Sequence, residues 1–141
     1  LKNGATTSVK VRGLRGVPAA ANTVLVNLTT LSSTGSGHLR AYPAGTAAPG
    51  TSNHSFRAGQ TISTLTWVQV GAGHKISLTA DGADTHVLVD VVGYLAGGGS
   101  ARFCPLPTAR VLDTRVAAGG RGPVKARSRS ALPSWVRCRS T

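Results

Sequence analysis

The aspartates supply all the carboxylate side chains that acid–base catalysis could use in this chain. All four of its acidic side chains are aspartates: Asp81, Asp84, Asp90 and Asp113. Glycoside hydrolysis needs two carboxyl groups on either side of the scissile bond, but Asp81 and Asp84 belong to one turn around the Asp81-Gly82 dipeptide. The chain also lacks the Gly-x-Ser-x-Gly motif of serine hydrolases. We therefore expect a protein that is not an enzyme.

The histidines and cysteines show no metal-site spacing. The four histidines are spread irregularly along the chain: His38, His54, His74 and His86. Because a structural zinc site needs ligands in short, paired spacings, we predict exposed or structural histidines and neither a metal nor another cofactor. Cys104 and Cys138 are also too far apart for such a site. In an oxidising compartment they would form one disulfide.

Cationic and aromatic side chains are the candidates for ligand binding. The chain has 16 Lys and Arg against 4 acids, a formal net charge of +12. Such a field attracts anionic polymers such as teichoic acids, acidic glycans or nucleic acid, although charge that serves solubility alone is an equal alternative. Guanidinium groups bind anions, and aromatic rings stack on sugars. We predict ligand contacts at loop tips from Arg12, Arg15, Arg40, Tyr42, Arg57 and Trp67.

A second group of charges is predicted to be structural. Asp90 interrupts the apolar run Val-Leu-Val-Asp-Val-Val, where a charge is costly unless it is paired. Asp113 lies between Arg110 and Arg115, and guanidinium groups pair with carboxylates through two parallel hydrogen bonds. We predict that these four residues form an ion-pair lock that fastens residues 103–115 to the rest of the fold. A ligand site is the weaker alternative.

Short strands are the elements that must position these side chains. The sequence has 18 Gly and no Glu or Met, so good helix formers are scarce. Alternating apolar residues, separated by turn residues, predict strands within residues 6–12, 23–31, 38–42, 52–56, 61–70, 75–79, 85–92 and 103–115. Segment 23–31 is apolar on both sides, so we expect it to be covered on both faces. The fold class predicted is all-β, a two-sheet antiparallel sandwich of jelly-roll or Ig-like type with about seven to nine strands.

The chain is long enough for one domain. We predict a sandwich body over residues 1–96, a Gly/Ser-rich linker over 97–101, a closing strand segment over 102–116 and a basic, poorly ordered tail over 117–141. The start at Leu1 without an initiator Met indicates a processed product or a piece of a longer chain. No run of 18 apolar residues is present, so no membrane span is predicted.

Several motifs carry a family resemblance. They are Arg15-Gly16-Val17-Pro18-Ala19, Asp90-Val91-Val92-Gly93-Tyr94 and Arg110-Val111-Leu112-Asp113-Thr114-Arg115. Together they resemble a β-rich repeat found in exported proteins of actinobacteria, over roughly residues 4–124. Such repeats occur in tandem or attached to extracellular enzymes. The resemblance therefore implies a secreted, extracellular or cell-surface protein with an accessory role.

The resulting prediction is a non-catalytic extracellular binding or adhesion module that docks on an anionic cell-wall polymer or glycan. A first alternative is a structural subunit. The Arg-Val-Leu-Asp-Thr-Arg segment opens the resembling repeat but closes this chain, so residues 103–115 could add a strand to another copy, although folding back is the default. A second alternative is non-specific nucleic-acid binding through the basic tail, which is weak because aromatic residues make up only 4% of the chain.

Overall fold

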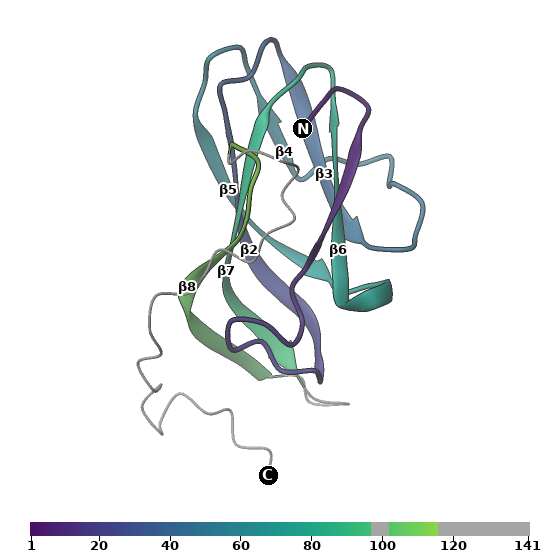
Figure 1. The fold of residues 1–141 in the computed structure, drawn as a ribbon, viewed down its shortest axis with the longest axis vertical. Coiled ribbons are helices and arrows are strands. Elements are labelled where there is room, and N and C mark those ends of the chain that lie inside the picture. Colours follow the sequence, from purple (N-terminus) through teal and green to yellow (C-terminus); the bar gives the residue numbers. More distant parts are fainter. Residues whose placement is uncertain (97–101, 116–141) are drawn as a thin grey trace.

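The chain folds into two antiparallel four-stranded sheets that pack face to face (Figure 1). The computed structural model describes residues 1–96 and 102–115. The strand order is β1-β6-β3-β4 in the first sheet and β5-β2-β7-β8 in the second. The strands are β1 (Thr6–Lys10), β2 (Ala21–Leu31), β3 (Gly37–Pro43), β4 (His54–Phe56), β5 (Ile62–Gln69), β6 (Lys75–Asp81), β7 (His86–Ala96) and β8 (Arg102–Asp113), with a short 3-10 turn, η1 (Ala72–His74), before β6. The predicted all-β two-sheet sandwich is confirmed.

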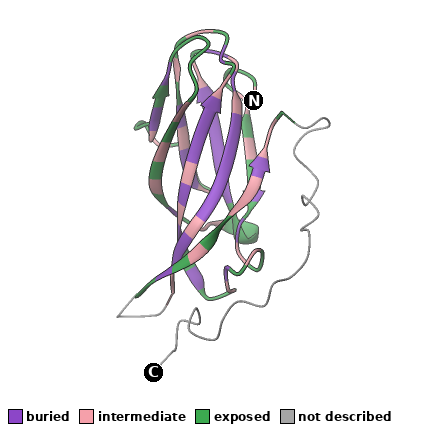
Figure 2. Cartoon of the chain, turned by 90° about the vertical axis from the view of Figure 1, so that its left-hand side faces the viewer, coloured by how far each residue is buried: buried purple, intermediate pink, exposed green. Residues whose placement is uncertain are grey.

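Alternation of apolar residues explains how the two sheets pack. On β2, Val24, Val26 and Leu28 point inward and are fully buried, as are Leu39 of β3 and Leu78 of β6. Burying side chains of this size contributes about 1.5–3 kcal/mol each. Figure 2 shows that the buried residues concentrate on the long central strands and that the exposed residues lie at the edges and loops. The sandwich is therefore held by one core between the sheets.

The outer face of β2 corrects one expectation. Leu25 and Asn27 point away from the core and are only half-buried, and within the described residues no further layer covers this face. The expected coverage on both faces is therefore not found among the described residues, where the outward Leu25 lies opposite Trp67 of β5 in the register. Its register partner lies in the same sheet. An apolar stretch of sequence does not distinguish such a neighbour from coverage by another layer.

A buried histidine links the two sheets. His54 on β4 is 4% exposed. Its Nε2 lies 2.7 Å from the Thr30 hydroxyl of β2, and its Nδ1 lies 2.7 Å from the Thr64 hydroxyl of β5. Burial lowers the pKa of this imidazole because the charged form loses hydration. His54 is therefore a structural residue.

The predicted closing strand segment is part of the second sheet. β8 pairs antiparallel with β7 of the same chain over almost its whole length. The predicted linker, residues 97–101, and the predicted tail, residues 117–141, lie outside the described residues. Among the residues that are described, no helix has the length and apolar character needed to cross a membrane.

Candidate anion-binding surface

The two ends of the sandwich carry different charges. Lys10 lies opposite Lys75 where β1 ends and β6 begins. The connection through η1 joins the end of β5 to the start of β6, so these strand ends of both sheets lie together (Figure 1). The opposite end carries Asp81 at the end of β6 and Asp113 at the end of β8. We call the first the basic end and define it by Lys10, Arg12, Lys75 and Arg102.

Two of the four aspartates are paired at the opposite end. Asp81 accepts a 2.8 Å hydrogen bond from Arg40 Nε, and Arg40 Nη2 forms a salt bridge to the same carboxylate oxygen at 2.6 Å. Asp84 lies in the loop after β6 and accepts a 2.7 Å bond from Lys2. That bond is the main reason why the pKa of Asp84 lies below its ordinary value. Both carboxylates are therefore compensated far from the basic end.

The other two aspartates belong to the predicted lock, and the structure brings its four residues together. Arg110 of β8 holds Asp90 of β7 in a bidentate pair, with distances of 2.7 Å from Nε and 3.1 Å from Nη2. Its Nη1 lies 3.4 Å from Asp113. Arg115 holds Asp113 through Nε at 2.9 Å and Nη2 at 2.6 Å. These hydrogen bonds from Arg115 lower the pKa of Asp113 to about 2.

This pairing leaves the basic end without an acidic partner. All four acidic side chains of the sequence lie elsewhere, and each is paired with a Lys or Arg. Lys10, Lys75 and Arg102 are exposed to solvent, and Arg12 is half-buried. The positive charges of these four residues are therefore not neutralised by any acidic side chain of the chain. Such a surface attracts anions.

Two of the predicted ligand residues form hydrogen bonds within the fold. Arg40 and Tyr42 lie on β3 and not at a loop tip as predicted. Arg40 also donates a 3.0 Å bond to the Pro49 carbonyl, and Tyr42, 6% exposed, places its hydroxyl 2.9 Å from that of Thr79. The loop after β3 folds back over these side chains. The turn propensities of the residues in a loop do not show over which side chains the loop folds.

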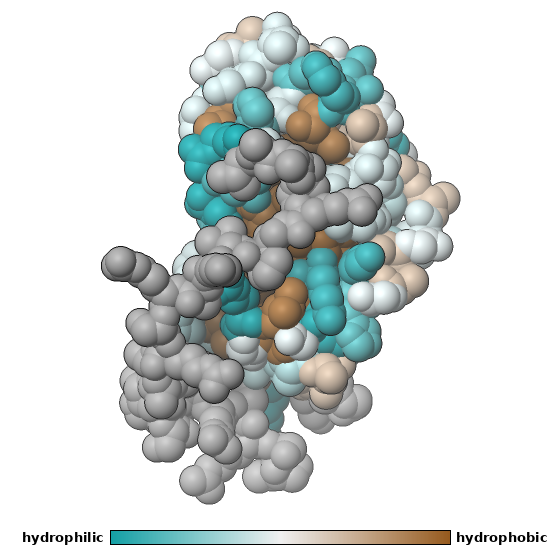
Figure 3. Space-filling view, in the orientation of Figure 1, coloured by the Kyte–Doolittle hydropathy of each residue, from teal (hydrophilic) through white to brown (hydrophobic). Residues whose placement is uncertain are grey.

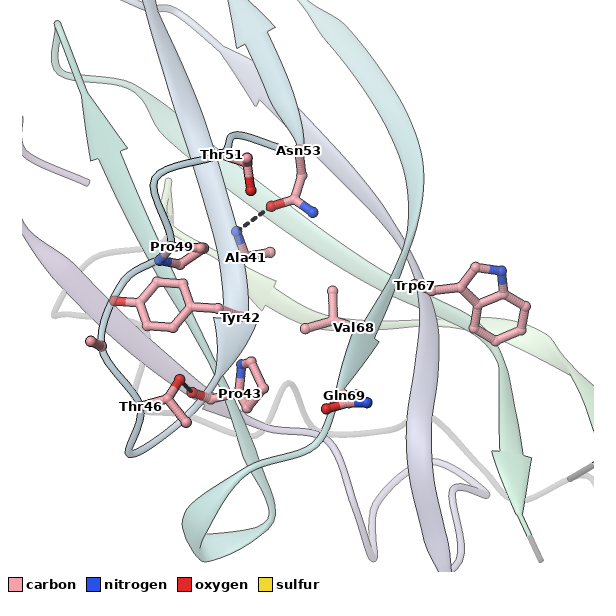
Figure 4. A pocket seen from close by; sticks show the side chains of 11 residues that line it. Ala41, Tyr42, Pro43, Thr46, Pro49, Thr51, Asn53, Trp67, Val68 and Gln69 are labelled. Carbon is pink, nitrogen blue, oxygen red and sulfur yellow. Dashed lines mark hydrogen bonds between the residues drawn. The ribbon is translucent and has the colours of Figure 1, made fainter. Parts of the chain in front are cut away.

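A hollow of about 300 Å³ lies beside Tyr42. Pro49 and Asn53 of the loop and Gln69 of β5 also line it, and none of its described lining residues is charged. Figure 4 shows Tyr42 beside Pro49 and the indole of Trp67 on the far side of β5. The hollow therefore offers hydrogen-bonding groups but no acid, base or anion-binding cation.

Trp67 forms an exposed aromatic pair on the outer face of the second sheet. Its ring contacts that of Phe103 edge to face, with centroids 5.7 Å apart and an angle of 87°, and the two residues are 46% and 49% exposed. The glycine at position 93 leaves room for the Phe103 ring, since a Cβ on residue 93 would lie 2.3 Å from that ring. On the uncovered part of the face shown in Figure 3, hydrophobic residues occur in small areas between hydrophilic ones. The sequence prediction included Trp67 and missed Phe103, whose pairing depends on register.

The remaining predicted ligand residues are divided between the two ends. Arg12 and Arg15 lie in the loop after β1, at the basic end, and Arg57 is exposed in the turn after β4, at the opposite end. The six predicted residues therefore form no single site. Lys10 and Lys75 were missed because only the strand register makes them neighbours.

Three further histidines and one of the two cysteines lie in the described residues. His38 lies 3.7 Å from Asp81, His86 Nδ1 lies 3.3 Å from the Thr114 carbonyl oxygen, and His74 is exposed. No group of three potential metal ligands occurs in the part of the chain that the structure describes. Cys104 is buried and is not a free thiol. Its predicted partner, Cys138, lies outside the described residues, so that pairing stays a prediction.

Comparisons with known proteins found no match among family models, curated proteins or solved structures.

Proposed function

We propose that this protein is a non-catalytic, extracellular binding module that docks on an anionic cell-wall polymer or glycan through its basic end. The observation that carries the proposal is the distribution of charge. Every aspartate is paired away from that end, so its cations have no acidic side chain of the chain's own as a partner. Cations without internal partners are available to external anions, and several of them acting together raise local polyanion concentration.

The aromatic pair supports a glycan as part of the target. Phe103 directly follows Arg102 on β8, so its ring lies near the basic end on the outer face of the second sheet, whereas Lys10 and Lys75 lie on the outer face of the first sheet. Exposed aromatic rings offer flat apolar surface, on which a sugar ring can stack. A polymer that carries both sugar rings and negative charges would use both surfaces.

Strand addition through residues 103–115 has less support. β8 is an edge strand that already pairs with β7 on one side. It carries Pro105 and Pro107, and proline removes the N–H group that a further strand would need. We therefore do not propose assembly as the function, and a sedimentation measurement of the mass at rising concentration would detect it.

The test is co-sedimentation of the full chain with purified bacterial cell walls. At about 20 mM salt we expect most of the protein in the pellet, and at about 500 mM we expect release, because salt screens electrostatic attraction. Dextran, a neutral polymer, is the control and should retain little protein. Absence of retention on walls at low salt would refute the proposal.

A further inference from the structure

A pair of like charges ends the outer face of the first sheet. Along β1 and β6, Thr6 and Thr79 face each other with their hydroxyl oxygens 2.7 Å apart, and the hydroxyls of Ser8 and Ser77 lie 2.9 Å apart. The next outward pair, two residues further along each strand, is Lys10 opposite Lys75. Facing side chains have Cβ atoms about 4.5–5.5 Å apart, and like charges at that distance repel.

The backbone places Arg12 beside this pair. The N–H groups of Val11 and Arg12 donate to the His74 carbonyl at 3.0 Å and 3.2 Å. His74, which directly precedes Lys75, has a φ of 64°, in the left-handed region that few non-glycine residues adopt. These two bonds hold the start of the loop after β1 against the start of β6. The backbone of a third cationic residue therefore lies next to the lysine pair.

Arg12 has an unsatisfied donor. Its Nε is buried, and within the described residues no acceptor reaches it. Buried donors in native proteins nearly always have a partner, since leaving one unpaired costs free energy. None of the aspartates supplies it, because they are paired with Lys2, Arg40, Arg110 and Arg115. Because Nε is closed to solvent, an external oxyanion would bind the rest of this half-buried guanidinium, and it would also relieve the repulsion between the lysines.

We propose that Lys10, Arg12 and Lys75 form a binding site for one phosphoryl oxyanion, supplied by the phosphodiester groups of a cell-wall polymer. The proposal deepens the proposed function and rests on it. Lysine binds phosphate as a point charge and arginine binds it through its planar fork. A phosphoryl group offers several oxygens in different directions to three cations, whereas a carboxylate offers two in one plane. Phosphate therefore fits this set better than a uronic acid.

The first experiment uses inorganic phosphate and thermal unfolding. The Tm of the wild type should rise with phosphate concentration relative to chloride at equal ionic strength, because a ligand that binds the folded state stabilises it. Phosphate also stabilises proteins through exclusion from their surfaces, so the readout is the difference between variants. The double variant K10Q/K75Q, and R12Q, should lose the extra rise.

The matched control is R57Q, which removes an exposed arginine at the opposite end and should keep the wild-type response. In chloride alone, K10Q/K75Q should unfold at the wild-type temperature or above it, since the repulsion is gone. A phosphate response equal in K10Q/K75Q and wild type would overturn the proposal. So would an equal loss in R57Q, because the effect would then be one of net charge.

The second experiment uses polymers and separates this proposal from the proposed function. Poly(glycerol phosphate) should bind the wild type at low salt, with an affinity that falls about tenfold or more in K10Q/K75Q and changes less than about twofold in R57Q. Polygalacturonate that binds as tightly, with the same losses, would refute the phosphoryl preference and leave the function standing. Failure of both polymers to bind would refute the function itself. Tighter binding of single-stranded DNA would overturn the choice of a wall polymer.

Discussion

The closing strand and the basic end each bring cationic side chains together, but the surroundings of those cations differ. Arg110 of β8 lies against Asp90, and Arg115, two residues beyond the end of β8, lies against Asp113, at distances down to 2.6 Å. At the basic end, Lys10 faces another lysine. Asp90 is only 8% exposed, so its pairing offsets the cost of burying its charge. The lysines are exposed, and water solvates them without a partner.

This difference separates charges that stabilise the fold from charges that are available for binding. Removing a cation from the lock should leave a carboxylate without compensation, whereas removing one from the basic end should relieve repulsion. The same type of substitution is therefore expected to have opposite effects on stability in the two regions. Three substitutions test that contrast, with expected changes in the free energy of unfolding that fall from about 2 kcal/mol to less than about 1 kcal/mol.

Arg110→Ala should be the most destabilising change. It leaves the nearly buried Asp90 without its bidentate partner, and loss of one partner of a fully buried pair costs about 3–5 kcal/mol. Because Arg110 is 38% exposed, solvent screening reduces the expected loss to about 2 kcal/mol. Urea unfolding would measure it. Arg57→Ala, the exposed control, should change stability by less than about 0.5 kcal/mol, and equal effects of the two variants would refute a structural role for the lock.

Asp113→Asn should lower stability by about 1 kcal/mol at neutral pH, a figure reduced for screening because Arg115 is 46% exposed. The pKa of Asp113 is depressed from 3.8 to about 2. Its contribution is therefore present above about pH 4 and is lost as the pH falls towards 2. Wild-type stability should fall across that window more steeply than that of the variant. Additive effects in a double-mutant cycle with Arg115→Gln would contradict the pairing.

Lys75→Glu should have the smallest effect on stability and a large effect on binding. Replacing a like-charge pair by an opposite-charge pair with Lys10 contributes about 0.2–1 kcal/mol to folding at a cross-strand position, so the variant should be as stable as the wild type or slightly more so. Its retention on cell walls at low salt should nevertheless fall strongly. Lys2→Glu, which breaks the exposed pair with Asp84, is the matched charge change. A Lys75→Glu protein less stable than Arg110→Ala would remove the contrast between the regions.

Local patterns were sufficient to predict the strands. Each of the eight strands lies within or overlaps a segment predicted from alternation and turn residues, because the alternation of side chains in a strand repeats every two residues. The end of β7 was the largest error in a boundary. The strand continues through Gly93 to Ala96, beyond the register irregularity between Val91 and Gly93, whereas the prediction ended it at Val92.

The candidate site was only partly predictable. A charged residue inside an apolar stretch needs a partner of opposite charge, so the sequence identified Asp90 as a paired residue. An arginine was the expected partner because its guanidinium group binds carboxylates through two hydrogen bonds. No such signal exists for Tyr42, which looks like an exposed aromatic residue near a loop but is buried. Nor does one exist for Arg12, whose half-buried position depends on the contact of its backbone with His74.

The sequence by itself determined the class of fold, the eight strand segments and the excess of positive charge, since these follow from residue types and their local order. Only the tertiary structure decided which charges are neutralised and which face each other. Lys10 meets Lys75, and Phe103 meets Trp67, through the pairing of strands that are far apart in the chain. Register is set by the packing of the whole sandwich, and it is register that placed the unpaired cations together at one end.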